Sequence, residues 1–193
     1  MPRSTDELVD YRILAVALHE AASHPANRFS TKEIAKKGGI SESVIFDHFK
    51  TKEGLIAKVD EMISVPFHDA ILLNAQKSHN FAEFFSRMLD YQVSHPDATA
   101  FAINYCLVFP RFDQRSDVDQ FRQNIEAMLK ETAPYFLQVS PADRFILWTR
   151  FNRELLSYAQ LFIEGKMADT PQNRERMASL LLSGLEPFAR KKP

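Results

Sequence analysis

The sequence predicts an all-α protein of about nine helices, divided into a small amino-terminal domain and a larger carboxy-terminal helical domain. Along most of the 193 residues, apolar side chains recur at spacings of three and four, which is the period of an amphipathic helix. No segment shows the alternation that indicates a half-buried strand. Prolines and glycines interrupt the helical period at intervals and mark the turns between helices.

The first expected helix runs from Tyr11 to Ala22, with an apolar stripe formed by Leu14, Ala17, Leu18 and Ala21. After it, residues 29–55 indicate two short helices joined by a glycine-containing turn. We expect Thr31 to cap the first of them. Gly38 and Gly39 supply the backbone freedom that the end of this helix needs.

Ser41 begins the second short helix, in which Ile45, His48 and Phe49 share one face. We expect these three side chains to point inward, with His48 as a packed residue that supports the helix. The outward residues are then Ser43, Phe46 and Asp47. Two short helices with this spacing are typical of a helix-turn-helix, in which the second helix enters the major groove of DNA.

The order of residues in this segment resembles the DNA-binding domain of TetR-type repressors. The resemblance covers roughly fifty residues. It is carried by Thr31, Ile34-Ala35, Gly39-Ile40-Ser41, Ile45-Phe46, His48-Phe49 and Lys52-Glu53. It implies a helix-turn-helix DNA-binding domain at 1–52 and a helical ligand-binding and dimerisation domain at 53–193. It also implies a homodimer that binds a double-stranded DNA operator and responds to a small-molecule effector.

Affinity for DNA comes largely from neutralised phosphates. From Arg28 to Lys58 the chain carries seven cations and four acids, and seven minus four gives +3. We expect the phosphate-positioning residues to be Thr31, Lys32, Lys36, Lys37, Lys50 and Lys52. Thr31 and Lys52 also match positions at which TetR-type repressors usually touch the DNA backbone. Base reading is expected from Glu42, Ser43, Val44, Phe46 and Asp47.

That outward face departs from the TetR pattern at three positions. TetR relatives commonly carry Gly, Thr and Tyr where this chain has Ser43, Val44 and Phe46, so two hydroxyls are lost. Glu42 and Asp47 add negative charge beside the phosphates, which costs affinity. A helical small-molecule or protein-binding protein that has lost specific DNA recognition is therefore the alternative.

The carboxy-terminal part continues the helical period. An apolar stripe from Leu55 to Ile71 runs across Pro66, which predicts either a kinked helix or a new helix beginning at the proline. Further helices are expected at Phe81–Val93, Ala98–Phe109, Ala142–Glu164 and Gln172–Arg190.

Two groups of residues in this part are candidates for function. Aromatic and amide side chains could line a pocket for a small apolar or amphipathic effector, or could be core residues: Phe85, Phe101, Asn104, Tyr105, Phe109, Trp148, Phe151, Asn152 and Tyr158.

The last two long helices could form a four-helix bundle with their symmetry mates, unless a monomer covers these surfaces itself. That homodimer interface would comprise Phe145, Leu155, Phe162, Met177, Leu180, Leu181, Gly184, Leu185 and Phe188. Gly184 is expected to let another backbone approach closely.

The composition of the chain limits where the protein can act and which chemistry it can perform. The net charge is −1, so any attraction to DNA must be local. Cys106 is the only cysteine, which excludes an intrachain disulfide and favours a reducing, cytoplasmic location. No apolar run is long enough to cross a bilayer, so no membrane partner is expected. The five glycines form no phosphate-binding pattern and the histidines are scattered, so we expect no catalytic residue, no metal and no cofactor.

Overall fold

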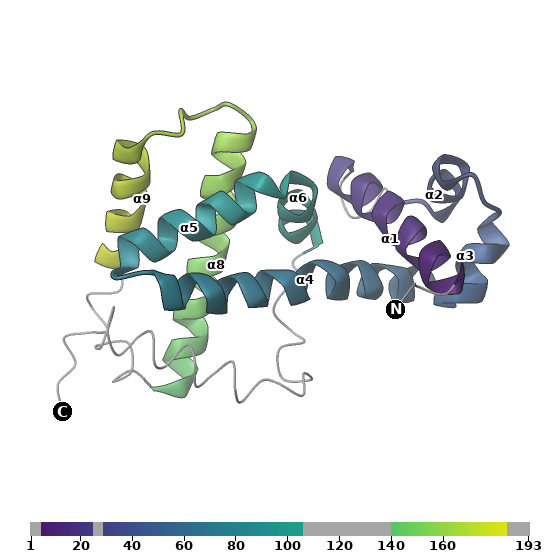
Figure 1. Ribbon diagram of the computed structural model, residues 1–193, viewed down its shortest axis with the longest axis horizontal. Coiled ribbons are helices and arrows are strands. Elements are labelled where there is room, and N and C mark those ends of the chain that lie inside the picture. The colour runs from purple at the N-terminus through teal and green to yellow at the C-terminus, as the bar shows by residue number, and fades with distance from the viewer. Residues whose placement is uncertain (1–4, 25–28, 106–139, 185–193) are drawn as a thin grey trace. The chain divides into compact units, whose positions relative to one another are not determined.

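The computed structural model describes residues 5–24, 29–105 and 140–184, whose helices are drawn in Figure 1. These helices are α1 (Thr5–Ser23), α2 (Thr31–Gly38), α3 (Glu42–Phe49), α4 (Lys52–Lys77), α5 (Phe81–Ser94), α6 (Pro96–Tyr105), α8 (Pro141–Ile163) and α9 (Pro171–Ser183). The described residues hold no strand, and the expected all-α class is confirmed. The last residues of the helices expected at 98–109 and 172–190 lie outside the described part of the chain.

The described residues form two compact units. Unit one comprises the described parts of Met1–Pro66 and Asp97–Val108, and unit two those of Phe67–Pro96 and Phe109–Pro193. Beyond residue 52, unit one therefore contains α4 as far as Pro66 and all of α6 except its first residue, Pro96. Both added segments contribute buried side chains to its core.

Unit one is organised around an apolar core to which five helices contribute. Ile13, Ile34, Ile45, Leu55 and Phe101 come from α1, α2, α3, α4 and α6, and each is at most 1% exposed. These residues are far apart in the sequence, so their burial holds the helices of unit one in one arrangement.

The buried stripe of α1 is shifted relative to the expected one. Ala17 and Ala21 are buried as expected, and Ile13 completes the stripe with them. Leu14 and Leu18 are half-buried and pack against the edge of the core. The reason is geometric, because positions 13, 17 and 21 follow one another at intervals of four on the same helix face.

The start of α2 differs from the expectation in one respect. The capping residue is Ser30, whose side chain accepts a hydrogen bond from the Glu33 amide, and Thr31 is the first residue of the helix. Capping needs a residue with non-helical backbone, and Ser30 has φ −126° and ψ 117°. The other end is as expected, because Gly39 adopts the left-handed conformation with φ 63° and ends the helix.

A single helix, α4, runs through Pro66 without a break. Of the two interpretations that the sequence left open, the structure therefore selects the continuous helix. The proline has no amide hydrogen to donate, so one backbone hydrogen bond of α4 is absent at this point. The division between the two compact units also falls directly after Pro66.

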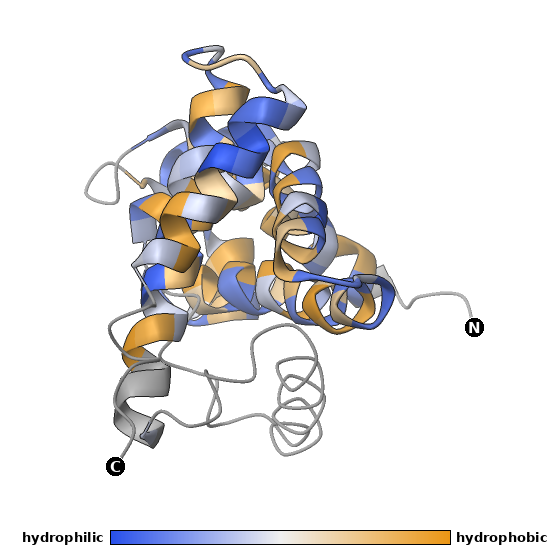
Figure 2. Ribbon diagram, turned by 90° about the vertical axis from the view of Figure 1, so that its left-hand side faces the viewer, coloured by the Kyte–Doolittle hydropathy of each residue, from blue (hydrophilic) through white to orange (hydrophobic). Residues whose placement is uncertain are grey.

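Unit two is built on α5, which contacts both α8 and α9. Phe84 of α5 stacks on Phe151 of α8 with ring centroids 5.9 Å apart, and Phe81 meets the same ring edge-on at 6.1 Å. Arg174 of α9 donates to the Asp90 carboxylate of α5 at 2.7 Å. In Figure 2, hydrophobic and hydrophilic residues both occur along the helical ribbons. Within the described residues, no helix is both apolar enough and long enough to serve as a membrane span.

The turn between α3 and α4 is unusually tight. Lys50 has a positive φ of 65°, a conformation that costs energy for a residue with a side chain. The next residue, Thr51, accepts a hydrogen bond from the Gly54 amide through its hydroxyl at 2.9 Å and so caps α4. A Cβ atom at Gly54 would overlap the carbonyl oxygen of Phe49. The turn that connects these helices therefore needs glycine at position 54.

Replacing Gly54 with Ala should lower the free energy of unfolding by about 2 kcal/mol, because the added methyl group must displace the α3–α4 turn. Gly38→Ala is a matched control, since a Cβ there would come no closer than 3.5 Å to Ile40. That control should be neutral or slightly stabilising, because Ala favours a helix more than Gly does. Urea unfolding followed by circular dichroism measures both, and equal effects would contradict this account of the turn.

Candidate nucleic-acid interface

One face of α3 is directed to solvent because the opposite face is buried in the core. Ile45 is fully buried, whereas Ser43, Phe46 and Asp47 are exposed as expected, and Phe46 is 40% exposed. Glu42 and Val44, the other two proposed base-reading residues, are half-buried, and Val44 packs against the core. The side chains of α3 that face solvent are therefore fewer than the set expected from the sequence.

His48 supports α3 from the inner side. Its Nδ1 lies 2.6 Å from the Asp10 Oδ1 of α1, and its ring centroid is 6.2 Å from that of Phe49. The side chain is 23% exposed. His48 thus joins α3 to α1, which fits the packed, supporting role expected for it.

Three hydroxyl groups near the starts of α2 and α3 form hydrogen bonds within the protein. The Thr31 hydroxyl of α2 donates to the carboxylate of Glu42, the first residue of α3. The hydroxyls of Ser41 and Ser43 lie 2.7 Å apart, and the Ser41 side chain does not cap α3. The first pair joins two residues of the proposed interface, and the second joins Ser43 to the residue before α3.

The lysines of the proposed interface fall into two groups. Lys32 and Lys36 are exposed, and the part of the chain that the structure describes holds no ion pair with either. Three others have partners. Lys37 forms an ion pair with Glu20, Lys50 donates to the Asp47 carbonyl oxygen at 2.6 Å, and Lys52 lies over the Phe29 ring with 5.5 Å between Nζ and the ring centroid.

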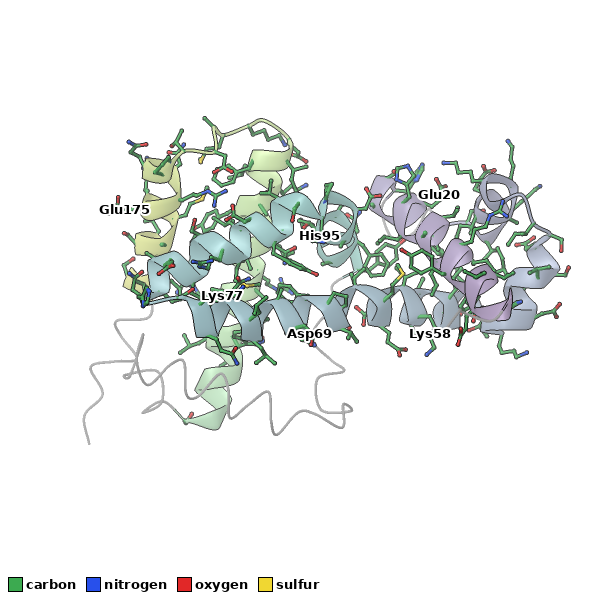
Figure 3. All side chains as sticks on the ribbon, viewed as in Figure 1. Glu20, Lys58, Asp69, Lys77, His95 and Glu175 are labelled. Atoms are coloured by element: carbon green, nitrogen blue, oxygen red, sulfur yellow. The ribbon has the colours of Figure 1, made fainter. Side chains whose placement is uncertain are left out.

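The ion pair between Lys37 and Glu20 connects two helices of unit one. Glu20 lies on α1, where Figure 3 labels it, and its side chain is only 6% exposed, whereas that of Lys37 is 49% exposed. A carboxylate that is buried to this extent needs a cationic or hydrogen-bonding partner. Lys37 therefore joins α2 to α1 in addition to any contact with DNA.

Arg12 is an exposed cation beside this surface that the sequence analysis did not single out. One of its guanidinium nitrogens lies 3.3 Å from the position that a Cβ of Gly39 would occupy, next to the turn between α2 and α3. The signal was present in the sequence, because Arg12 directly precedes the buried Ile13 and so lies on an adjacent face of α1.

The candidate effector-binding residues are divided between the two units. Phe101, Asn104 and Tyr105 belong to unit one, where Phe101 and Tyr105 stack at 4.8 Å and Asn104 donates to the Ala21 carbonyl oxygen at 3.3 Å. The others that are described, Phe85, Trp148, Phe151, Asn152 and Tyr158, belong to unit two, and Phe109 lies outside the described residues.

Within unit two these residues form an aromatic cluster. Phe151 has ring contacts with Trp148 at 5.5 Å and with Phe85 at 6.5 Å, and Tyr158 contacts Phe85 at 6.1 Å. Burial raises the pKa of the Tyr158 hydroxyl, and the neighbouring Glu154 carboxylate adds to this effect. Asn152 is 1% exposed, and its Oδ1 has no hydrogen-bond partner within the described residues.

Two cavities of unit two lie elsewhere. One of about 400 Å³ is lined by α8 residues that include Ile146 and Arg150, and one of about 600 Å³ is lined by α5 and α9 residues that include Ser86 and Arg174. None of the candidate effector-binding residues lines either cavity. The Arg174 guanidinium is also occupied by two carboxylates, those of Asp90 and Asp169.

The candidate dimer residues also differ in exposure. Leu155, Phe162, Met177 and Leu181 are buried inside the chain, whereas Leu180 is 53% exposed. The atoms nearest to a Cβ built at Gly184 belong to the Arg150 side chain, which donates to the Gly184 carbonyl oxygen at 3.1 Å. Ile146 of α8, which the sequence analysis did not select, is 57% exposed. The Phe145 side chain, Leu185 and Phe188 lie outside the described residues.

No metal site is evident in the described ranges, where no group of three His, Cys, Asp or Glu side chains could hold a metal ion.

Comparison with known proteins finds similarity to regulators of the tetR family. Residues 13–59 match the family model of bacterial regulatory proteins of the tetR family. A TetR family transcription regulator from Marinobacter aquaeolei VT8 has a similar structure, with a TM-score of 0.68, 17% identity, and coverage of 92% of this chain and 95% of that chain. The fatty acid degradation regulator FadR from Bacillus halodurans gives a TM-score of 0.58 and 16% identity, with coverage of 91% and 98%.

Among curated proteins, the nucleoid occlusion factor SlmA from Aliivibrio fischeri is 25% identical over 134 residues. The match covers 67% of this chain and 66% of that relative, so the chain spans about two thirds of the relative's length.

Replacing Lys37 with Met should lower the free energy of unfolding by about 2 kcal/mol, because the buried Glu20 carboxylate loses its partner. Lys36→Met removes the same charge from the same helix at an exposed position without a described ion pair, and should change stability by less than about 0.5 kcal/mol. Urea unfolding of the two variants tests this. Similar losses of stability in both would argue against a structural role for Lys37.

Proposed function

We propose that the chain is a DNA-binding transcriptional regulator, because its residues 13–59 match the family model of tetR regulatory proteins and its fold is similar to that of TetR-type regulators. It acts in the cytoplasm as a homodimer on a double-stranded operator, and a small apolar or amphipathic effector releases it. The observation that carries the proposal is the exposed face of α3, in which Ser43, Phe46 and Asp47 face solvent while Ile45 is buried. A short helix held by its inner face is what reading the major groove requires.

Affinity in this proposal comes from cations around α2 and the start of α4. The exposed Lys32 and Lys36 bind phosphates, together with Lys52 at the first residue of α4. The Lys52 Nζ lies over the Phe29 ring, and this contact leaves the ammonium charged. Lys37 and Lys50 contribute charge while their side chains are held by Glu20 and by the Asp47 carbonyl oxygen.

The effector in this proposal binds in unit two. Its aromatic cluster offers apolar contacts, and the Oδ1 of Asn152 is a buried acceptor that a hydroxyl or amide of the effector could satisfy. An effector that binds one arrangement of the helices better than another shifts the protein toward that arrangement. Release of DNA follows if the favoured arrangement no longer matches the spacing of the two operator half-sites.

The dimer forms through the exposed apolar residues of α8 and α9. Ile146 and Leu180 are both more than half exposed in the single chain, which is unfavourable for large apolar side chains unless a partner covers them. A twofold interface uses the same patch on both copies, so each residue contributes twice.

A second candidate is a helical binding protein that has lost specific DNA recognition. The observations that favour it are the two acids on α3, Glu42 and Asp47, and the engagement of the Thr31 hydroxyl by Glu42. A binding assay at several salt concentrations, with DNA flanking the gene of this protein, distinguishes the two. Specific retention that weakens as salt rises supports the regulator, whereas absence of any affinity supports the second candidate.

Lys52→Ala should weaken binding to every DNA sequence and lower the slope of log K against log salt by about one, because one phosphate contact is lost. Lys58→Ala is the matched control, since Lys58 lies further along α4 and pairs with Glu61 at 2.6 Å. Its slope should stay as in the wild-type protein. Fluorescence anisotropy at several salt concentrations gives both slopes, and an unchanged slope for Lys52→Ala would remove it from the phosphate contacts.

Leu180→Glu should convert the dimer to a monomer, because it places two charges in the apolar patch of a twofold interface. Ser179→Glu adds the same charge at the neighbouring exposed position of α9 and should leave the dimer intact. Sedimentation velocity measures the mass of each species. A wild-type protein that sediments as a monomer would refute the proposed assembly.

A further inference from the structure

The first residues of the two helices in the helix-turn-helix are joined by a hydrogen bond. Thr31 begins α2 and Glu42 begins α3, and the Thr31 hydroxyl donates to the Glu42 carboxylate. Both side chains are half-buried, whereas the residues that follow them, Lys32 and Ser43, are exposed. The bond therefore lies directly beside the surface that is proposed to face DNA.

The hydroxyl is the donor that stabilises the Glu42 carboxylate in this contact. In the ranges 5–24, 29–105 and 140–184, no Lys, Arg or His side chain forms an ion pair with Glu42. Its position in the first turn of α3 adds a favourable field, because the amino-terminal end of a helix stabilises negative charge. The carboxylate thus combines a hydroxyl donor with the positive end of a helix.

A DNA phosphate would use the same donor. Carboxylate and phosphate oxygens both accept charge-assisted hydrogen bonds. A threonine hydroxyl has one proton, so Thr31 cannot donate to both acceptors at once. Formation of a Thr31–phosphate bond therefore requires that the Thr31–Glu42 bond be broken.

Given the proposed function, on which this inference rests, we propose that the Glu42 carboxylate is an internal competitor of the DNA phosphate for the Thr31 hydroxyl. In the free protein the Thr31 hydroxyl donates its hydrogen bond to the Glu42 carboxylate. When DNA binds, the same hydroxyl donates to a phosphate of the DNA backbone instead. The Glu42 carboxylate has then lost the hydrogen bond from Thr31 and lies near a phosphate of the same charge, so the two groups repel each other. Glu42 is accordingly a residue that lowers affinity for every DNA sequence, and not a base-reading residue.

The first part of the test removes the charge and keeps the shape. Glu42→Gln should bind both operator DNA and an unrelated duplex about five-fold more tightly at fixed salt, because a neutral acceptor competes less well for the hydroxyl. Glu61→Gln removes the same charge from an exposed position on α4, where the side chain is 59% exposed. That control should change affinity by less than about two-fold.

The second part asks whether Thr31 is the group in competition. In the wild-type chain Thr31→Val should change affinity by less than about two-fold, because it removes one hydrogen bond from the free state and one from the bound state. In the Glu42→Gln background the same substitution should weaken binding by about five-fold. Thr31→Ser retains the hydroxyl and should match the parent protein in both backgrounds. Circular dichroism melts establish that each variant is folded.

The outcomes separate this inference from the proposed function. Equal losses for Thr31→Val in both backgrounds, or a Glu42→Gln protein that binds no more tightly, overturn the competition. If the wild-type protein binds DNA and Lys52→Ala weakens it, the regulator survives that result. DNA binding that is gained only in Glu42→Gln supports the competition, whereas absence of binding in wild type and variant alike overturns both proposals.

Discussion

The burial of Ile45 is the constraint on which the proposed interface depends. This side chain is fully buried together with Ile34 of the preceding helix and Leu55 of the following one. Because a short helix has little stability of its own, its packing decides which face it presents. With Ile45 inside, the exposed residues of α3 follow from the helical period. A polar residue at position 45 would remove that orientation before any DNA contact were considered.

The sequence was sufficient for features that are local. The helical period and the glycine turn located α2 and α3, and Gly39 has the left-handed conformation expected for it. What the sequence could not supply were partners that are distant along the chain. Glu20 and Lys37, Asp10 and His48, and Thr31 and Glu42 meet only because helices pack, and no spacing rule relates them. The functional surface is therefore harder to predict than the helices that carry it.

Prediction from hydrophobic periodicity has a second limit. The periodicity identifies the apolar face of a helix, but it does not identify the element that covers this face. Leu155 and Leu181 were therefore expected at a dimer interface, whereas the chain buries both itself. The exposed Ile146 was overlooked because its neighbours are also apolar. In the same way, an aromatic residue such as Phe101 could not be assigned to a pocket or to a core until the units were known.

The contribution of α6 to unit one has a consequence for how this protein is made and handled. Phe101 lies in the core of unit one, although about thirty residues that belong to unit two precede α6 in the chain. During synthesis, the amino-terminal core stays incomplete until α6 has left the ribosome. A fragment that ends at Pro66 would expose the apolar surface that Phe101 covers. The first three helices therefore do not form a complete unit by themselves, and a fusion that contains only these helices would expose the core residues that Phe101 covers.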